Sequence, residues 1–354
     1  MSDSSTINYF TLIMSSLPRF SQINPATIVA ELDTILAQNR AELLLLLSEI
    51  ISLDWNFIQK LDDLDDRLQH FWSPINHLHA VKQTAKLRLA YNECLAKISA
   101  YSSELSQNSR LYQAIKTLDN GDYRFNYAQK KCLHNELRDF HLGGIDLPKA
   151  KQKRYQVIQA QLAQLSNQFE ENLLDATANW SKCISDKSEL KGLPTYIIAS
   201  AEKAAKDKNM SGCLLSLDYP CYFPVLSYAD NRALRESVYK AYITRASEFG
   251  NMAFDNSPIM FKILNLRHEL SQLLGFKNYA QKSLASNKMA KTPEEVLSFL
   301  ENLLRCTQSK ADAEWQALYN FAQSRDQIDT LQPWDILYYC EKLQEKMFGI
   351  CDDT

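Results

Sequence analysis

The amino-acid sequence predicts an all-α protein. Glycine and proline are scarce, at 8 and 10 of 354 residues, whereas average proteins contain about 7% glycine and about 5% proline. Few glycines leave few tight turns, and the composition is rich in strong helix formers such as leucine, alanine, glutamine, glutamate and lysine. Apolar residues also recur every three or four positions over long stretches, which is the spacing of one face of an α-helix.

The first helices are expected after a polar, serine-rich entry segment at residues 1–24. Asn24-Pro25 predicts a helix start, because proline is tolerated in the first helical turn. The helical spacing then continues from Thr27 to Phe71. A break is expected at Trp72-Ser73-Pro74, since proline lacks the backbone N–H that a helix interior needs.

The later helices show the same periodicity and are bounded by proline, glycine or asparagine, which are common at helix ends. We expect a helix pair at 80–118 and single helices at 127–142, 148–180, 231–247, 256–274, 292–323 and 333–348.

The periodicity changes near residues 213–229. Two short apolar runs occur there, Cys213-Leu-Leu-Ser-Leu and Tyr222-Phe-Pro-Val-Leu, with Pro220 and Pro224 at the second one. Short apolar runs between turn signals are typical of strands. We therefore predict a small two-stranded insertion, or an extended loop, in this segment.

Charge and cysteine content exclude several classes of function. The net charge of -3 provides no basic surface for nucleic acid. Eight cysteines without a C-x-x-C pair favour free thiols in a reducing compartment. The apolar run Leu43–Leu47 is shorter than the roughly 20 residues that span a bilayer, and Tyr9–Met14 is too short for a signal peptide. We expect a soluble, cytoplasmic protein with no nucleic-acid or membrane partner.

One segment, His268-Glu269-Leu270-Ser271-Gln272, comes close to a catalytic motif. In the His-Glu-x-x-His signature, two imidazoles one helical turn apart bind zinc, and the glutamate activates a metal-bound water. Gln272 stands where the second histidine is required, and an amide oxygen is a weak zinc ligand beside imidazole. We therefore interpret His268 and Glu269 as residues of a structural helix.

Three other groups combine residue types that bind metals: His70 with His77 and His79; Asp62, Asp63, Asp65 and Asp66; and His134 and His141 with Glu136 and Asp139. The first group has no carboxylate at ligand spacing, and the aspartates lack the loop that cages a divalent cation. Salt bridges along one helix explain the third group. From these patterns we assign no catalytic, cofactor-binding or metal-binding residue.

Several consecutive segments resemble the thimet oligopeptidase family of zinc metallopeptidases, and most closely its bacterial oligopeptidase A branch. The likeness is collinear and covers nearly the whole chain after the entry segment. It is carried by Asp66-Arg-Leu, Ser73-Pro-Ile-Asn-His77-Leu, Ala128-Gln-Lys-Lys, Leu137-Arg-Asp-Phe, Gly144-Ile-Asp-Leu-Pro-Lys, Leu174-Asp-Ala-Thr, Leu226-Ser-Tyr-Ala-Asp-Asn-Arg-Ala-Leu-Arg-Glu, the run from Arg235 to Ser247, the run from Ile263 to Ala280, Ser283-Leu-Ala, Lys288-Met-Ala and Leu331-Gln-Pro-Trp-Asp with Tyr338-Tyr339.

The resemblance implies an all-α clam of two domains around a deep channel, in which one zinc ion serves the cleavage of short peptides. It also implies that the zinc histidines, the general-base glutamate and the third ligand lie beyond Tyr338-Tyr339, in sequence absent from these 354 residues. We expect a polar entry segment at 1–24, an N-terminal helical domain at 25–220, and the truncated start of a metallopeptidase catalytic region at 221–354. No zinc is expected to bind to this chain.

Three functions are compatible with these expectations. The first is a truncated oligopeptidase that is inactive alone. The second is one half of a split oligopeptidase, completed by a separate zinc-binding chain that carries His-Glu-x-x-His. The third is a non-catalytic helical module that binds peptides or a partner. Independent hydrolysis through His268 and Glu269 fails for want of metal ligands.

Overall fold

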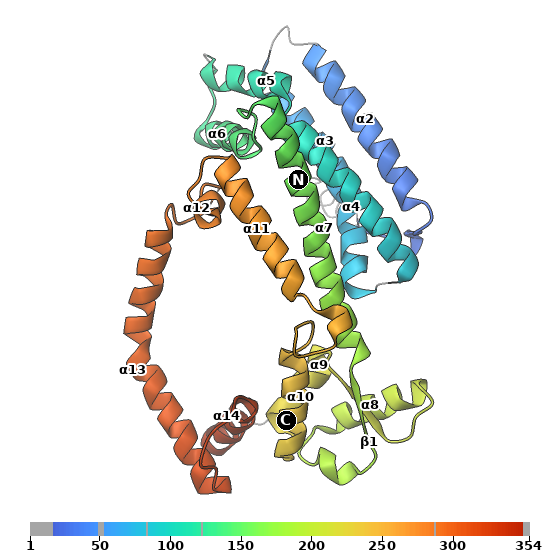
Figure 1. Ribbon diagram of the computed structural model, residues 1–354, viewed down its shortest axis with the longest axis vertical. Helices are drawn as coiled ribbons and strands as arrows, with labels where there is room; N and C mark the ends of the chain where they lie inside the picture. The colour runs from blue at the N-terminus through green and yellow to red at the C-terminus, as the bar shows by residue number, and fades with distance from the viewer. Residues whose placement is uncertain (1–16, 49–52, 83, 122, 287, 350–354) are drawn as a thin grey trace, which may run out of the picture. The chain divides into compact units, whose positions relative to one another are not determined.

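The computed structural model describes residues 17–48, 53–82, 84–121, 123–286 and 288–349. Across these ranges the chain is almost entirely helical, with two short strands as its only sheet (Figure 1). The predicted all-α class with a small two-stranded element is confirmed. The chain divides into two compact units, one of residues 1–164 with 266–289 and one of residues 165–265 with 290–354. The predicted boundary at residue 220, between the N-terminal helical domain and the start of the catalytic region, stays a prediction.

The first unit consists of α-helices and one 3-10 helix. It contains η1 (Phe20–Gln22), α2 (Ile28–Ser48), α3 (Trp55–Val81), α4 (Ala85–Ser106), α5 (Ser109–Asn120), α6 (Tyr127–Leu142), α12 (Tyr279–Leu284), the first part of α7 (Lys149–Asn179) and the last part of α11 (Ser257–Leu273).

Two apolar clusters hold the first five helices of this unit together. Helices α2, α3 and α4 lie side by side (Figure 1) and bury Leu32, Ile75 and Cys94 between them. Helices α5 and α6 pack against each other and add Ile115 and Leu133 to a second cluster with α2 and α3. Burial of such aliphatic side chains stabilises the fold by roughly 1.5–3 kcal/mol each.

The second unit combines the remaining helices with the two strands. It contains the last part of α7, β1 (Ser181–Ile184), η2 (Lys187–Leu190), α8 (Thr195–Asp207), β2 (Cys213–Ser216), α9 (Tyr219–Tyr228), α10 (Arg232–Ile243), η3 (Met252–Phe254), the first part of α11, α13 (Pro293–Asp326) and α14 (Pro333–Phe348). Its main core surrounds α9, whose Val225 is fully buried, and includes Leu215 of β2 and Val238 of α10.

The strand prediction is correct for one segment and wrong for the other. Cys213–Ser216 is strand β2, but its antiparallel partner is β1, with Ser181 opposite Ser216. The run Tyr222–Leu226 belongs to helix α9 instead of a strand. Pro220 lies in the first turn of α9, where proline costs no backbone hydrogen bond, so it starts a helix here.

Two further helix predictions differ from the structure. Helix α3 continues through Pro74 to Val81, although a break was expected there. Ile75 and His79 are 2% and 3% exposed beyond the proline, so packing against the neighbouring helices compensates for the lost hydrogen bond. Helix α8 was not predicted, and it buries Ile197, Ala201 and Ala205 at helical spacing.

Local end signals place other helices accurately. Helix α6 begins at Tyr127 behind a capping box in which Asn126 and Gln129 bond each other's backbone N–H, and it ends at Leu142 before Gly143. Helix α14 spans Pro333–Phe348 as predicted. The described part of the entry segment is short, because residues 1–16 lie outside the described ranges.

Candidate functional site

The His-Glu pair lies on α11, where His268 is exposed and the Glu269 side chain is bound to an arginine of α7. Arg154 Nε and Nη2 donate to the two carboxylate oxygens of Glu269, each at 2.6 Å. These hydrogen bonds lower the pKa of Glu269, so the carboxylate is a weaker proton acceptor. Gln272 Nε2 donates to the carbonyl oxygens of Phe276 and Lys277 at 3.3 and 2.9 Å. This donor set does not fit a zinc ion.

The three histidines of α3 have separate environments. His79 is buried and stacks on Tyr91 with 3.8 Å between ring centroids. His77 is exposed and lies 5.5 Å from the ring of Phe20. The Nδ1 atom of His70 is 2.9 Å from the carbonyl oxygen of Asp66, one turn earlier on the helix. The structure therefore does not bring the three imidazoles to one point.

The acidic residues of α3 face those of α6 across a cavity. Asp62 and Asp65 line this 320 Å³ cavity together with Glu136 and Asp139. Desolvation raises the pKa of Asp62, and the charges of Asp63 and Asp65 raise it further. Within the described ranges, no group of three or more histidine, cysteine, aspartate or glutamate side chains has an arrangement that could hold a metal ion. The assignment of no metal-binding residue remains a prediction.

His134 and His141 each lie near an aspartate, but the partners differ from those expected along the helix. His134 Nε2 lies 3.2 Å from Asp119 at the end of α5. His141 Nδ1 contacts the Asp146 carboxylate, which follows α6. Both contacts join α6 to neighbouring segments and so have a structural role.

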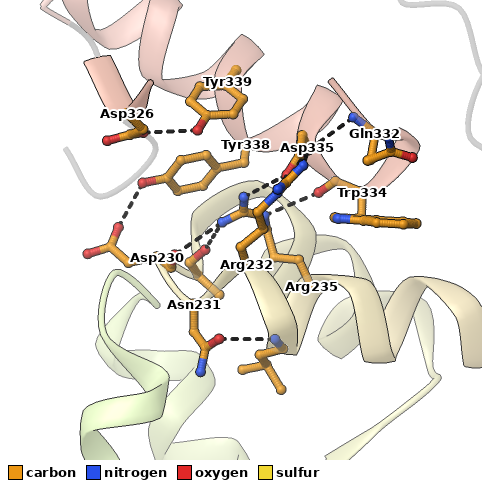
Figure 2. A network of polar contacts seen from close by, with 12 residues as sticks. Asp230, Asn231, Arg232, Arg235, Asp326, Gln332, Trp334, Asp335, Tyr338 and Tyr339 are labelled. Atoms are coloured by element: carbon orange, nitrogen blue, oxygen red, sulfur yellow. Dashed lines mark hydrogen bonds and ion pairs between the residues drawn. The ribbon is translucent and has the colours of Figure 1, made fainter. Parts of the chain in front are cut away.

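An extensive polar network joins α10 to the start of α14 (Figure 2). Asn231 is the N-cap of α10, and its side chain accepts a hydrogen bond from the Leu234 backbone N–H. Arg232 is therefore the first residue of the helix. Arg235 follows three residues later and therefore projects from the same side of the helix. On α14, Asp335 is the third residue of the helix and accepts the N–H of Gln332 at 3.0 Å.

Asp335 lies at the centre of this network, fully buried and bonded to two arginines. Arg232 Nη2 donates to its Oδ2 at 2.6 Å, and Arg235 Nη2 donates to its Oδ1 at 3.0 Å. Burial alone raises the pKa of Asp335, but hydrogen bonds from Arg232, the Gln332 backbone and Arg235 outweigh it, so the pKa lies below its ordinary value. The carboxylate is therefore held in its charged form.

The remaining hydrogen bonds of Arg235 go to the backbone. Its Nη1 donates to the carbonyl of Ala229 at 2.7 Å and its Nε to that of Trp334 at 3.2 Å. Its guanidinium carbon also lies 4.0 Å from the ring centroid of Tyr338. A buried arginine that is paired in this way stabilises one arrangement of the helices that contact it.

Two tyrosines of α14 extend the network. The hydroxyl of Tyr338 donates to Asp230 and that of Tyr339 donates to Asp326, both at 3.0 Å. Burial raises the pKa of Tyr338 to about 12, and the hydrogen bond to Asp230 adds to this shift, so the phenol stays protonated. Because these charged and hydroxyl groups are paired with one another, the network holds α10 and α14 together.

Most residues of this network lie in segments that resemble the thimet oligopeptidase family, but Asp326 does not. The cap at Asn231 and the Gln332–Asp335 capping box have local signals that a sequence analysis can find. The pairing of Arg232 with Asp335 has no local signal, because 103 residues separate them.

None of the helices in the described ranges is long and apolar enough to cross a membrane.

Two family models match the chain. The model of the N-terminal domain of neurolysin and thimet oligopeptidase matches residues 32–152, and the model of peptidase family M3 matches residues 225–354. The two matched regions contain most of α2–α6 in the first unit and the Asp335 network in the second.

Curated relatives match nearly the whole chain. Oligopeptidase A of Salmonella typhimurium is 46% identical over 96% of this chain, and that of Escherichia coli is 44% identical over 95%. Probable cytosolic oligopeptidase A of Arabidopsis thaliana is 34% identical over 95% of the chain. The matches cover 50%, 50% and 49% of these relatives, so the chain spans about half the length of the curated relatives it matches.

Proposed function

Because the chain belongs to peptidase family M3, the family of thimet oligopeptidase, we propose that it serves the hydrolysis of short peptides as the helical N-terminal part of a zinc-dependent oligopeptidase. We propose further that these 354 residues bind no zinc and cleave no peptide by themselves. The activity then requires ligands and a general base from sequence that the 354 residues do not contain.

One observation carries the second part of the proposal: in the near match to a zinc motif, the side chains of Glu269 and Gln272 already make hydrogen bonds within the chain. Glu269 is paired with Arg154 through both carboxylate oxygens, and Gln272 bonds two backbone carbonyls at the end of α11. A zinc site needs three protein ligands with free lone pairs and a second shell that orients them. Recruiting Glu269 would leave the Arg154 guanidinium without its carboxylate.

The test combines metal content with peptide cleavage. The chain is loaded with zinc, separated from free metal, and assayed with a quenched fluorescent peptide. We expect no stoichiometric zinc and no chelator-sensitive cleavage, and Glu269→Gln should behave like the unmodified chain. One zinc ion per chain together with cleavage that Glu269→Gln abolishes would overturn the proposal.

A second candidate, one half of a split oligopeptidase, is favoured by the surface of α13. The C-terminal end of this helix buries Leu318 and Ala322 in a cluster that includes Tyr338 and Tyr339 of α14. Towards its N-terminus the helix continues with apolar residues at similar spacing that are about half or more exposed: Leu297 at 57%, Leu300 at 50%, Leu304 at 63% and Trp315 at 51%. An exposed apolar stripe of this kind favours association with another helix.

The split arrangement has a direct test. The chain is mixed or co-expressed with a candidate chain that carries His-Glu-x-x-His, and zinc content and peptide cleavage are measured on the complex. Activity that appears only in the mixture, and that falls with Leu300→Asp, supports this candidate. A mixture that forms a complex without zinc or cleavage contradicts it.

We also propose a cytoplasmic location without nucleic-acid or membrane partners. Seven cysteines in the described residues are free thiols, which suits a reducing compartment. Cell fractionation with thiol labelling tests this proposal, and a disulfide-bonded or membrane-associated form would contradict it.

A further inference from the structure

Arg245, just after α10, has a guanidinium group with unused donors. Its Nε and Nη1 atoms are buried and have no hydrogen-bond partner among the described residues. This contrasts with Arg235, whose Nε, Nη1 and Nη2 all donate to backbone or carboxylate oxygens. A buried donor without a partner destabilises the fold, and does so more strongly when it is charged. The arrangement therefore calls for an acceptor.

Aromatic stacking holds the Arg245 side chain in place. Its guanidinium carbon lies 3.4 Å from the ring centroid of Tyr242. That ring stacks in turn on Tyr222, with 3.7 Å between centroids and 11° between planes. The cation is thus fixed at the end of a stack of two tyrosines before any ligand arrives, which lowers the entropy cost of binding.

The backbone next to Arg245 is strained. Ala246 has a φ of 51°, in the left-handed region that residues other than glycine rarely adopt. Its carbonyl oxygen accepts the N–H of Asn256, which helps to hold this turn. Backbone strain of this kind is concentrated at functional sites, including those that bind ligands.

Arg245 is one of the residues that line a cavity of 370 Å³ in the second unit, a size within the range of about 300–1,000 Å³ typical of ligand pockets. Apolar side chains form much of its wall, including Trp180, Leu217 and Phe254, and Asn179 and Asn251 supply amide groups. None of the described residues that line it is acidic. The cavity therefore offers a cation and an apolar wall but no carboxylate to pair with the cation.

We propose that this cavity binds a carboxylate attached next to an apolar side chain, as in the C-terminal residue of a short peptide. Guanidinium groups form strong, often bidentate hydrogen bonds with carboxylates, and the wall of Trp180, Leu217 and Phe254 accommodates the apolar side chain. The choice of a peptide as the source of the carboxylate rests on the proposed function. The need for an anionic group follows from Arg245 and the cavity alone.

Binding to the full chain can be measured without catalysis or zinc. The chain is labelled with 5-fluorotryptophan, the Trp180 signal is identified with Trp180→Phe, and N-acetyl-leucine and N-acetyl-leucinamide are titrated while the fluorine spectrum is recorded. We expect the acid to shift the Trp180 signal and to bind about tenfold more tightly than the amide, which corresponds to about 1.4 kcal/mol. Equal affinity of acid and amide, or no shift of the Trp180 signal, would overturn the proposal.

Variants identify the cation. Arg245→Gln should remove the preference for the acid, and Arg245→Lys should keep part of it because the charge remains. Arg267→Gln is a matched control, since Arg267 also lies over a tyrosine ring, 5.0 Å from the centroid of Tyr279, but does not line the cavity. An unchanged preference in Arg245→Gln would overturn the assignment. If a variant fails to fold, the comparison of acid and amide in the unmodified chain still tests whether the cavity prefers a carboxylate.

A third probe distinguishes the sources of the carboxylate. N-acetyl-glutamic acid α-amide carries its carboxylate on the side chain and has a blocked C-terminus. We expect it to bind more weakly than N-acetyl-leucine. Binding that is equally tight or tighter would assign the cavity to acidic side chains and overturn its assignment to peptide C-termini. The proposed peptidase function would be unaffected, because that proposal depends on zinc content and cleavage.

Discussion

Replacement of Asp335 by asparagine should destabilise the second unit strongly. The substitution keeps the size of the side chain and an oxygen that can still accept the N–H of Gln332, so the start of α14 keeps its cap. It removes the charge that faces Arg235, whose side chain is only 1% exposed. Removing one partner of a buried ion pair costs about 3–5 kcal/mol, because the other charge stays buried without compensation.

The matched control is Arg232→Gln. Arg232 donates to the same carboxylate, but its side chain is 43% exposed. Solvent screens such a group, and we expect its loss to cost about 1 kcal/mol or less. The difference between the two variants therefore measures the effect of burial on otherwise similar contacts to Asp335.

The assay is urea unfolding, monitored by circular dichroism and by tryptophan fluorescence. Because the chain contains two compact units, the two signals are analysed separately. The free energy of unfolding should decrease for the transition of the second unit, which contains Trp334. A loss of less than about 1 kcal/mol for Asp335→Asn would refute the reasoning. It would show that Arg235 finds water or another acceptor when the carboxylate charge is gone.

The same variant has a predicted pH dependence. The folded protein holds the pKa of Asp335 below its ordinary value of 3.8, so the unfolded chain binds the proton more tightly. The stability that the carboxylate contributes is therefore complete above pH 3.8 and is lost as the pH falls through the lower folded value. The difference between the unmodified chain and Asp335→Asn should be constant near neutral pH and shrink only in acid. A difference that shrinks near neutral pH would contradict the assignment.

Two other predictions concern backbone and thiol groups. Gly192→Ala should cost clearly more than about 1–2 kcal/mol in urea unfolding, because the new Cβ would overlap the carbonyl oxygen of Tyr228 in addition to the strain of a positive φ. Gly275→Ala, with nothing within 4 Å of its Cβ, should cost only the strain, and equal losses would contradict this account. Burial raises the pKa of the Cys94 thiol to about 11, so Ellman's reagent should modify exposed Cys306 quickly and Cys94 only on unfolding. Modification of both at similar rates in the folded chain would refute this.

Local sequence signals determined most of the helices. The limits of α6 and α14 follow from residues that act within one turn: the Asn126–Gln129 capping box with Gly143 for α6, and Pro333 with Gly349 for α14. Such signals concern hydrogen bonds between near neighbours, so the sequence contains all the partners needed to predict them.

The candidate site could be predicted only in part, because only some of its features depend on residues that are close in sequence. The mismatch at Gln272 is visible in the sequence, because ligand spacing on a helix is a local property. That Glu269 is paired with Arg154 is not visible, since 115 residues separate them. Nor does any local pattern show that the donors of Arg245 lack partners.

Tertiary structure alone decided the elements whose stability depends on distant residues. Strand β2 pairs with β1, which precedes it in the sequence by the length of helix α8 and its flanking loops. The prediction that its partner follows directly after it was therefore wrong. Helix α3 continues through Pro74 because Ile75 and His79 are buried against other helices. The sequence by itself determined the helical class and the family likeness, which are sums of many local preferences. Pairings such as Arg232 with Asp335 were decided by folding, because burial of a charge depends on residues about one hundred positions away.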